Sequence, residues 1–197
     1  MHPFSNYTKD EELKELFKKF TRLYEALGNS FLEKLQRLPS LPDMVVDRWE
    51  KGKLLGFGEG SNIYDNSLVI GNVKVGKECW IGPNTILDGS GNLTIGDFCT
   101  VSAGVHIYTH DNVKQTLSSK KLIIERNPTQ IGNNVYVGPH AVITRGVTIG
   151  NNVIIGSFAF VNKNIPNNAI VIGQPAKQIG IIENNENGEI TYKYFEK

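Results

Sequence analysis

His110 is the residue in this sequence whose type and setting best suit chemistry. It stands in the segment Tyr108-Thr109-His110-Asp111, at the start of a long stretch that separates two regular parts of the chain. An imidazole changes its charge near neutral pH, so it can take a proton from a group that attacks an electrophile. Asp111, or a backbone carbonyl, would hold the ring in one orientation. We therefore expect His110 to be a general base, with Asp111 beside it as a second catalytic residue.

The other histidines and the two cysteines are weaker candidates. His106 and His140 fall on positions that should face solvent, and His2 lies near the beginning of the sequence. Cys79 and Cys99 are far apart and belong to no CxxC pair or metal-binding cluster. We therefore expect no metal.

The elements that must position His110 follow from a repeat with a period of six residues. An aliphatic residue recurs at this spacing, with a shift of two positions near residue 90 and a longer interruption between Ile107 and Ile131. The repeating residues are Ile63, Val69, Val75, Ile81, Leu87, Ile95, Val101, Ile107, Ile131, Val137, Ile143, Ile149, Ile155 and Val161. A period of six fits neither a helix nor a single strand, but it fits a coil of short parallel strands with a turn every six residues. The sequence therefore predicts a mainly β protein, a parallel β-helix of hexapeptide repeats.

Two further features support this coil. The residue two before each repeating aliphatic should also point inward, and most residues at this position are small or β-branched, as a narrow interior requires. Cys79 and Cys99 both fall there, so we expect them in the core. Gly often follows the repeating aliphatic, where we expect it to adopt the unusual backbone angles of a corner. A flat α/β sheet would need helical segments between its strands, and residues 63–175 contain none.

The N-terminal part of the chain has a different pattern. Residues 8–38 carry apolar side chains at the spacing of an amphipathic helix, interrupted at Gly28-Asn29, and Thr8 with Glu11 resembles a capping box. The polar side of this helix mixes Lys with Glu, which favours packing on the coil or on another subunit over binding to a membrane surface.

The C-terminal part and the long interruption complete the expected organisation. Asn187-Gly188 lies between two apolar segments and predicts a hairpin, which would cover the exposed edge at one end of the coil. A long loop on a regular coil is uncommon unless it has a function. The predicted parts are an N-terminal helical segment at 1–53, a β-helix at 54–177 with a protruding loop at 108–130, and a C-terminal hairpin or cap at 178–197.

The composition argues against several classes of partner. The formal net charge of the 197 residues is +1, so bulk charge gives no reason to expect nucleic acid or an anionic membrane. No apolar run approaches the ~20 residues of a membrane span. The first residues lack the apolar core of a signal peptide, so we expect a cytoplasmic, reduced protein.

The stretch Ile131–Ile179 carries a resemblance to a known family. It reads IGNNVYVGPHAVITRGVTIGNNVIIGSFAFVNKNIPNNAIVIGQPAKQI, and its most specific parts are N-I-P-N-N and the following G-Q-P-A-K. Over roughly residues 63–180 the chain resembles the left-handed β-helix acyltransferases with hexapeptide repeats, and most of all the sugar and surface-polysaccharide O-acetyltransferases. The resemblance implies a left-handed coil, acetyl-CoA as co-substrate, and a homotrimer with active sites between subunits.

The resemblance also implies roles for individual residues. His110 matches the catalytic base of the family, although the motif around it is two residues shorter here. Positions that line the CoA groove in the family correspond to Pro139, Ser157, Asn162, Lys163 and Lys177. The last of these stands where the family has a basic residue, often Arg, that meets the CoA phosphates.

The acceptor side departs further from the family. The galactoside enzymes hold the sugar with an Asn and an Asp, and the corresponding positions here are Gly82 and Ser90. Asn84 and Asp88 lie nearby and are the candidates for binding the acceptor. A glycan, a lipid-linked sugar or a nucleotide-sugar fits this pattern equally well.

The expected function is therefore transfer of an acetyl group from acetyl-CoA to a hydroxyl of a sugar or surface-polysaccharide precursor. One alternative is N-acetylation of a nucleotide-linked amino-sugar, which depends less on a base. A second is a zinc-dependent carbonic anhydrase on the same fold. Its only candidate zinc ligands would be His106, His110 and His140, which lack the usual spacing. A third is a scaffold without catalytic activity.

Overall fold

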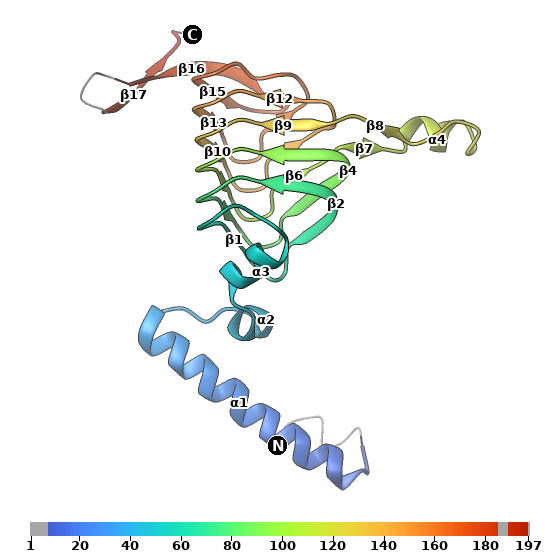
Figure 1. The fold of residues 1–197 in the computed structure, drawn as a ribbon, viewed down its shortest axis with the longest axis vertical. Helices are drawn as coiled ribbons and strands as arrows, with labels where there is room; N and C mark the ends of the chain where they lie inside the picture. Colours follow the sequence, from blue (N-terminus) through green and yellow to red (C-terminus); the bar gives the residue numbers. More distant parts are fainter. Residues whose placement is uncertain (1–7, 185–188, 197) are drawn as a thin grey trace. The chain divides into compact units, whose positions relative to one another are not determined.

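A computed structural model describes residues 8–184 and 189–196 of the chain (Figure 1). The chain divides into two compact units, residues 1–47 and 48–197. The first holds α1 (Glu11–Leu35) and α2 (Leu41–Val45). The second begins with α3 (Arg48–Leu54), which packs against the first strand of the coil, β1 (Asn62–Ile63). None of the helices in the described ranges has the length and apolar character of a membrane-spanning segment.

The first unit is dominated by α1. Asp10 caps its N-terminus, because its carboxylate accepts from the backbone N–H of Glu12 at 2.9 Å and of Leu13 at 3.3 Å. The expected cap, Thr8, instead accepts from the N–H of Asp10 itself. The helix also continues through Gly28, where an interruption was expected. Apolar side chains along α1 remain about half exposed, namely Leu13, Leu16, Phe20, Leu23, Tyr24, Leu32 and Leu35.

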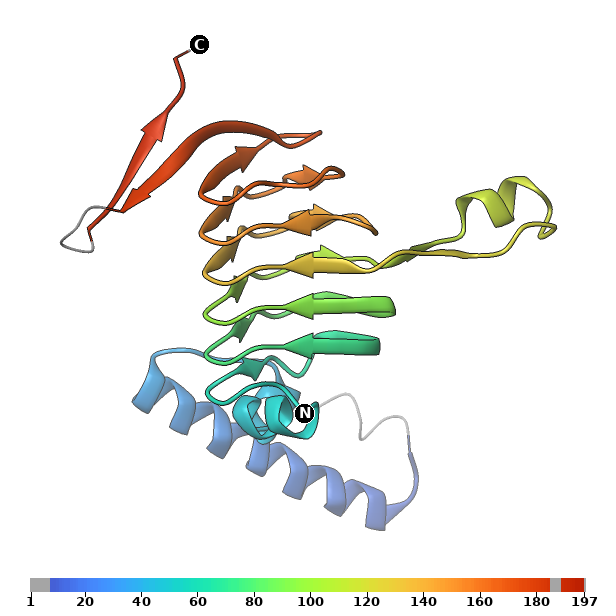
Figure 2. The ribbon, with the colours of Figure 1, turned by 45° about the horizontal axis from the view of Figure 1, so that its top comes forward.

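The second unit is a coil of short parallel strands stacked turn upon turn, which confirms the predicted fold class (Figure 2). One sheet orders its strands as β1, β3 (Trp80–Ile81), β5 (Thr100–Val101), β10 (Val135–Val137), β13 (Val153–Ile155), β15 (Ala169–Ile172), β16 (Lys177–Asn184) and β17 (Ile190–Tyr194). The other sheet contains β2 (Leu68–Val75), β4 (Ile86–Ile95), β6 (His106–Ile107), β9 (Thr129–Ile131), β11 (Val142–Ile143), β12 (Thr148–Ile149) and β14 (Phe160–Val161). Strands β2 and β4 turn a corner within their length, so the second sheet covers two faces of the coil.

The strand register follows the repeat and its two irregularities. Ile63 pairs with Ile81, one regular turn of 18 positions later. Ile81 pairs with Val101, 20 positions later, because of the two-residue shift. Val101 pairs with Val137, because the long interruption lies within that turn. The stacked pairs therefore stay in phase, and the extra residues are displaced outward from the coil.

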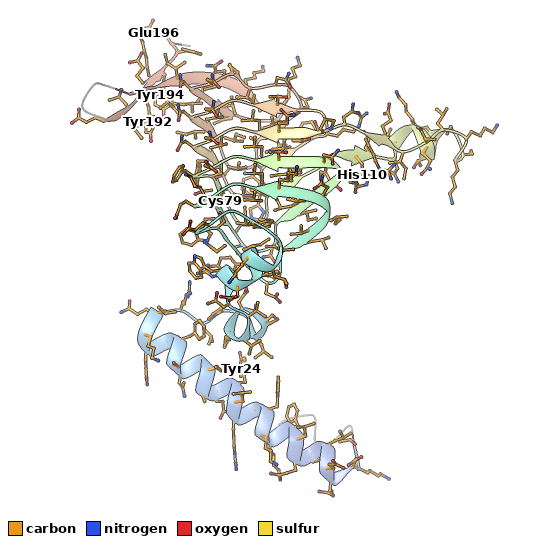
Figure 3. The ribbon with its side chains drawn as sticks, in the orientation of Figure 1. Tyr24, Cys79, His110, Tyr192, Tyr194 and Glu196 are labelled. Carbon is orange, nitrogen blue, oxygen red and sulfur yellow. The ribbon has the colours of Figure 1, made fainter. Side chains whose placement is uncertain are left out.

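The core is the interior of the coil. Nearly all of the repeating aliphatic residues are buried, and the residues two positions before them point inward as predicted. Cys79 and Cys99 are each 1% exposed and unpaired, which confirms their place in the core. Their thiols donate to the carbonyl oxygens of Gly96 and Gly132 in the next turn, at 3.0 and 3.1 Å. Figure 3 shows Cys79 within the coil.

The role expected for the repeated glycines was wrong. The glycines directly after the repeating aliphatic residues do not have a positive φ. The positive φ belongs instead to the residue two positions after the glycine, as at Asn84 (φ 57) and Asn134 (φ 57). Those glycines are required by close approach of the next turn. A Cβ on Gly132 would lie 2.5 Å from Oδ1 of Asn151 and 2.8 Å from the backbone of Gly150.

One edge of the coil, where each turn passes to the β1–β3–β5–β10 sheet, carries a ladder of side-chain hydrogen bonds. Oδ1 of Asp97 accepts from the N–H of Lys77 at 2.9 Å, and Asn133 bonds the N–H of Asp97 at 2.8 Å. Asn151 and Asn167 repeat this bond on the next two turns, each at 2.7 Å. We call this the Asn edge. It satisfies backbone donors that a corner would otherwise leave without partners.

The chain ends in an antiparallel hairpin. Strand β16 pairs antiparallel with β15, and β17 pairs antiparallel with β16. These strands correspond to the predicted C-terminal hairpin, whose Asn187-Gly188 turn lies outside the described residues. Figure 1 shows the hairpin extending past the last turn of the coil.

Candidate active site

Both irregularities of the repeat lie on the same edge of the coil, which we call the His110 edge. The two extra residues fall between Leu87 and Ile95, within β4, and the long interruption falls between Ile107 and Ile131 in the next turn. The turn after that passes this edge between Ile143 and Ile149 without extra residues. Three successive corners are therefore stacked directly on one another.

The long interruption is an arm that projects from the coil (Figure 2). Its base is a ribbon of β7 (His110–Asp111) and β8 (Glu125–Arg126), which pair antiparallel, and its outer part contains the short helix α4 (Val113–Leu117). His110 lies at the root of this arm, beside the coil (Figure 3). The arm is thus anchored at the residue predicted to act as the base.

His110 makes a short hydrogen bond to Asp88 in the turn below. Nδ1 of the ring lies 2.6 Å from Oδ2 of Asp88. The His110 side chain is 35% exposed, whereas the Asp88 side chain is fully buried. A carboxylate only accepts, so Nδ1 carries the proton and Nε2 of the neutral ring keeps a lone pair. The site therefore holds the tautomer that a general base requires.

Asp88 is held in its charged form by a set of donors. Its Oδ1 accepts from the hydroxyl of Ser90 at 2.6 Å and from the N–H of Ser90 at 3.0 Å, and its Oδ2 accepts from the N–H of Thr109 at 2.8 Å. Burial on its own would raise the pKa of Asp88. The hydrogen bonds from Ser90, Thr109 and His110 outweigh burial and lower this pKa well below its usual range.

Thr109 joins the two lower corners of the His110 edge. Its hydroxyl donates to the carbonyl oxygen of Asp88 at 2.8 Å and accepts from the N–H of Gly91 at 2.7 Å. A Cβ on Gly91 would lie 2.5 Å from the carbonyl oxygen of Thr109. Sequence reasoning gave no role to Thr109 or Gly91, and it named Ser90 only as the position that corresponds to a sugar-binding residue of the galactoside enzymes. The signal that could have found them was the two-residue shift, which widens the corner at this point.

Asp111 does not orient the ring, in contrast to the prediction. Its carboxylate accepts from Nε of Arg145 and from the N–H of Val113. The hydrogen bond from Arg145 is the main reason that the pKa of Asp111 is lowered. Asp88 therefore occupies the position that was assigned to Asp111.

The acceptor-binding assignment also needs correction at Asp88. Its side chain has no exposed surface, so it cannot contact an acceptor directly. Asn84 is exposed, but it lies at another corner, where its Oδ1 accepts from Asn66 at 2.9 Å. The structure therefore does not bring Asn84 and Asp88 together into one exposed site.

The residues matched to the CoA groove lie on both sides of one coil face, formed by β6, β11 and β14. Pro139 and Ser157 stand at the corners that precede β11 and β14. Asn162 and Lys163 follow β14 at the His110 edge, and Lys177 begins β16.

A cavity of about 380 Å³ opens at this face, and the residues that follow Pro139 and Ser157 in sequence line it. It is lined by His140, Val142, Phe158, Ala159, Phe160, Gln174 and Pro175. The rings of His140 and Phe158 stack at its wall, with centroids 5.0 Å apart. Among the described residues, no group of three His, Cys, Asp or Glu side chains is arranged to hold a metal ion.

Comparison with known proteins agrees with this architecture. Residues 128–163 match the model of the bacterial transferase hexapeptide (six repeats), and residues 72–109 match that of the hexapeptide repeat of succinyl-transferase. Protein CapG of Staphylococcus aureus is 43% identical over 115 residues, which are 56% of this chain and 67% of CapG. The chain belongs to the hexapeptide-repeat acyltransferases.

Other members of this family are similar over a comparable region. Galactoside O-acetyltransferase of Escherichia coli (strain K12) is 33% identical over 132 residues, which cover 57% of this chain and 65% of that enzyme. The chain spans between 57% and 67% of the length of curated relatives such as these. A solved structure of galactoside acetyltransferase in complex with coenzyme A superimposes with a TM-score of 0.62 at 25% identity, covering 87% of this chain and 82% of that one.

Proposed function

We propose that this protein transfers an acetyl group from acetyl-CoA to a hydroxyl of a sugar or surface-polysaccharide precursor. The observation that carries the proposal is the 2.6 Å bond between Nδ1 of His110 and the buried carboxylate of Asp88. It leaves Nε2 of a partly exposed imidazole as the proton acceptor, at the edge of a coil whose relatives include galactoside O-acetyltransferase.

In this proposal His110 moves one proton in each direction. Nε2 takes the proton of the acceptor hydroxyl while the hydroxyl oxygen bonds to the carbonyl carbon of the thioester. The C–S bond then breaks, and the imidazolium returns the proton to the leaving thiolate. Acetyl ester and free thiol are the products, and no oxidant or metal enters the balance.

Asp88 has a supporting role in this reaction. Its charge is maintained by the donors from Ser90 and Thr109, and it stabilises the imidazolium that His110 becomes. In a low-dielectric site a charge-assisted bond of this kind is stronger than a neutral one. Asp88 also fixes the ring, so that Nε2 keeps one direction.

Five residues would bind CoA. Pro139, Ser157 and Asn162 border the β6–β11–β14 face, and the sequence neighbours of the first two, His140 and Phe158, line the cavity of about 380 Å³. Lys163 and Lys177 are exposed and offer point charges for phosphate groups. The related galactoside acetyltransferase was solved in complex with coenzyme A, which supports a groove of this kind.

The outer surface of the coil exposes apolar side chains that would suit contact with other subunits, as the proposed trimer requires. Two faces expose apolar side chains, including Trp80 (51% exposed), Tyr136 (45%) and Leu68 (52%). On the third face the outward column is polar and comprises Lys74, Thr94, Gln130 and Thr148. Exposed apolar columns of this kind are typical of subunit interfaces. We propose that His110 of one subunit faces a CoA groove formed partly by its neighbour.

The test is acetyl-CoA consumption by the purified protein against a panel of glycans, nucleotide-sugars and amino-sugars. Replacing His110 with Ala should lower kcat on the best hydroxyl acceptor by a factor of about 10²–10⁴, because general-base assistance has that size. Thr148→Ala is the control, since Thr148 is exposed on the polar third face, away from the proposed CoA groove, and it should keep nearly full activity. If His110→Ala remained nearly as active as the wild type, O-acetylation by this site would be refuted. Transfer only to amines would favour the N-acetyltransferase.

A further inference from the structure

Arg145 binds both strands of the ribbon that carries His110. It lies in the corner directly above, between β11 and β12, and its side chain is 26% exposed. Its Nε donates to Asp111 in β7, and its Nη2 donates to Glu125 in β8 at 2.7 Å. Its Nη1 donates to Oδ1 of Asn127, just beyond β8, at 2.5 Å. Each nitrogen of the guanidinium thus has a different partner.

We propose that Arg145 is the positioning residue that keeps His110 aligned with Asp88, an inference that rests on the function proposed above. The ribbon contains only two paired residues on each strand, His110 with Arg126 and Asp111 with Glu125. A two-stranded ribbon this short is not stable by itself in water. Contacts from the coil must therefore hold it, and the guanidinium supplies three of them.

The points that Arg145 holds lie on either side of His110. Asp111 is the next residue in β7, and Glu125 and Asn127 flank Arg126, the residue that pairs with His110. At the base of the arm, the N–H of Asn127 donates to the carbonyl oxygen of Thr109 at 2.9 Å. The N–H of Thr109 in turn donates to Oδ2 of Asp88, in the corner below, at 2.8 Å. The backbone of His110 is therefore fixed between the corner that contains Asp88 and the corner that contains Arg145.

The charges of this network also balance. Asp111 and Glu125 supply two negative charges, and Arg145 supplies one positive charge between them. Lys114 supplies the other, because its Nζ lies 2.8 Å from Oε1 of Glu125 on the solvent side of the arm. Lysine at position 145 could replace the charge but not the three diverging donors. The proposal therefore requires the three diverging donors of the guanidinium and not only its positive charge.

Displacement of His110 should affect the chemical step more than binding. A misplacement of about 1 Å can cost on the order of 10²-fold in rate. Arg145→Ala should therefore lower kcat about 30- to 100-fold, while the KM for acetyl-CoA stays within about threefold. Arg145→Lys should recover little of this loss. Lys114→Ala, which removes an exposed ion pair to the same Glu125, should change kcat less than twofold.

A second readout reports the position of the ring without any activity. The proton in the Nδ1–Oδ2 bond should give a downfield proton NMR signal that disappears in His110→Ala. We expect Arg145→Ala and Arg145→Lys to lose or broaden this signal and Lys114→Ala to retain it. The wild-type signal would be present even if the proposed reaction were wrong, so the two proposals fail separately.

The outcomes are distinct. An Arg145→Ala protein that keeps both the signal and its kcat within threefold would overturn the proposal. So would full recovery by Arg145→Lys, because charge alone would then suffice. If Arg145→Ala does not fold, Arg145→Lys and Asp111→Asn carry the same test. A reduction of kcat of at least fivefold is expected for each, and a retained kcat would overturn the proposal.

Discussion

The Asn edge and the His110 edge belong to the same coil but are built in different ways. At the Asn edge, Asn133, Asn151 and Asn167 make the same hydrogen bond turn after turn. At the His110 edge each corner contributes a different residue, first Asp88, then His110, then Arg145. At the Asn edge the repeat is regular. Both irregularities of the repeat lie at the His110 edge. Stacking brings residues that are far apart in sequence into one site.

The sharpest test of this contrast is the same substitution at both edges. Asp88→Asn keeps the shape of the side chain but removes the charge opposite His110, so kcat should fall by a factor of about 10²–10⁴, as for other carboxylate–imidazole pairs. Asp97→Asn at the Asn edge keeps an oxygen for the N–H of Lys77, and kcat should stay within about twofold. Steady-state kinetics of both variants decide the matter. Equal losses would mean that the two edges do not differ in function.

A smaller effect is expected on stability at the Asn edge. Gly132→Ala would place a methyl group 2.5 Å from Oδ1 of Asn151 and against the Gly150 backbone, and should lower the free energy of unfolding by about 1–3 kcal/mol or more. Gly56→Ala is the control, because φ is +73° there but nothing lies within 4 Å of a Cβ. Backbone strain alone should cost about 1–2 kcal/mol. Urea denaturation should therefore rank Gly132→Ala as the more harmful, and the reverse order would contradict the close-approach explanation.

The smallest effect concerns the pH dependence of stability. The pKa of Asp88 is lowered in the folded protein, so the unfolded chain binds this proton first as pH falls. The stabilisation from Asp88 is complete above about pH 5 and is lost progressively below pH 4, on the order of 1–2 kcal/mol. In urea denaturation at pH 7, 5 and 3, Asp88→Asn should lose less stability towards acid than the wild type does. Parallel curves would show that Asp88 is not held in its charged form.

The sequence was sufficient for the coil but not for the partner of His110. The six-residue period determined which residues point inward, including Cys79 and Cys99, because the pattern is local and regular. His110 was found because it stands at the largest break in that pattern. Asp111 was chosen for its adjacency, yet successive strand residues point to opposite sides, so Asp111 faces Arg145 while His110 faces Asp88.

The role of the glycines and the partner of His110 were mispredicted for the same reason, because each depends on contacts between turns. The role of the glycines depends on how closely the next turn approaches, and the period alone does not contain that distance. The contact between Asp88 and His110 exists because their two corners are stacked on each other. Predicting it would have required knowing that the two-residue shift within β4 lies at the same edge as the arm. In both cases the deciding contact joins residues of two neighbouring turns, and a pattern within one turn does not predict it.

The antiparallel pairing of β15 and β16 has a consequence for growth. A coil of parallel strands offers at its last turn a template on which another parallel turn could add, from the same chain or from a second molecule. Strand β16 runs in the opposite direction, and its register slips between Ile170 and Val171. A further parallel turn therefore finds no matching edge there. The hairpin therefore occupies the edge of β15 on which a further parallel turn would otherwise pair.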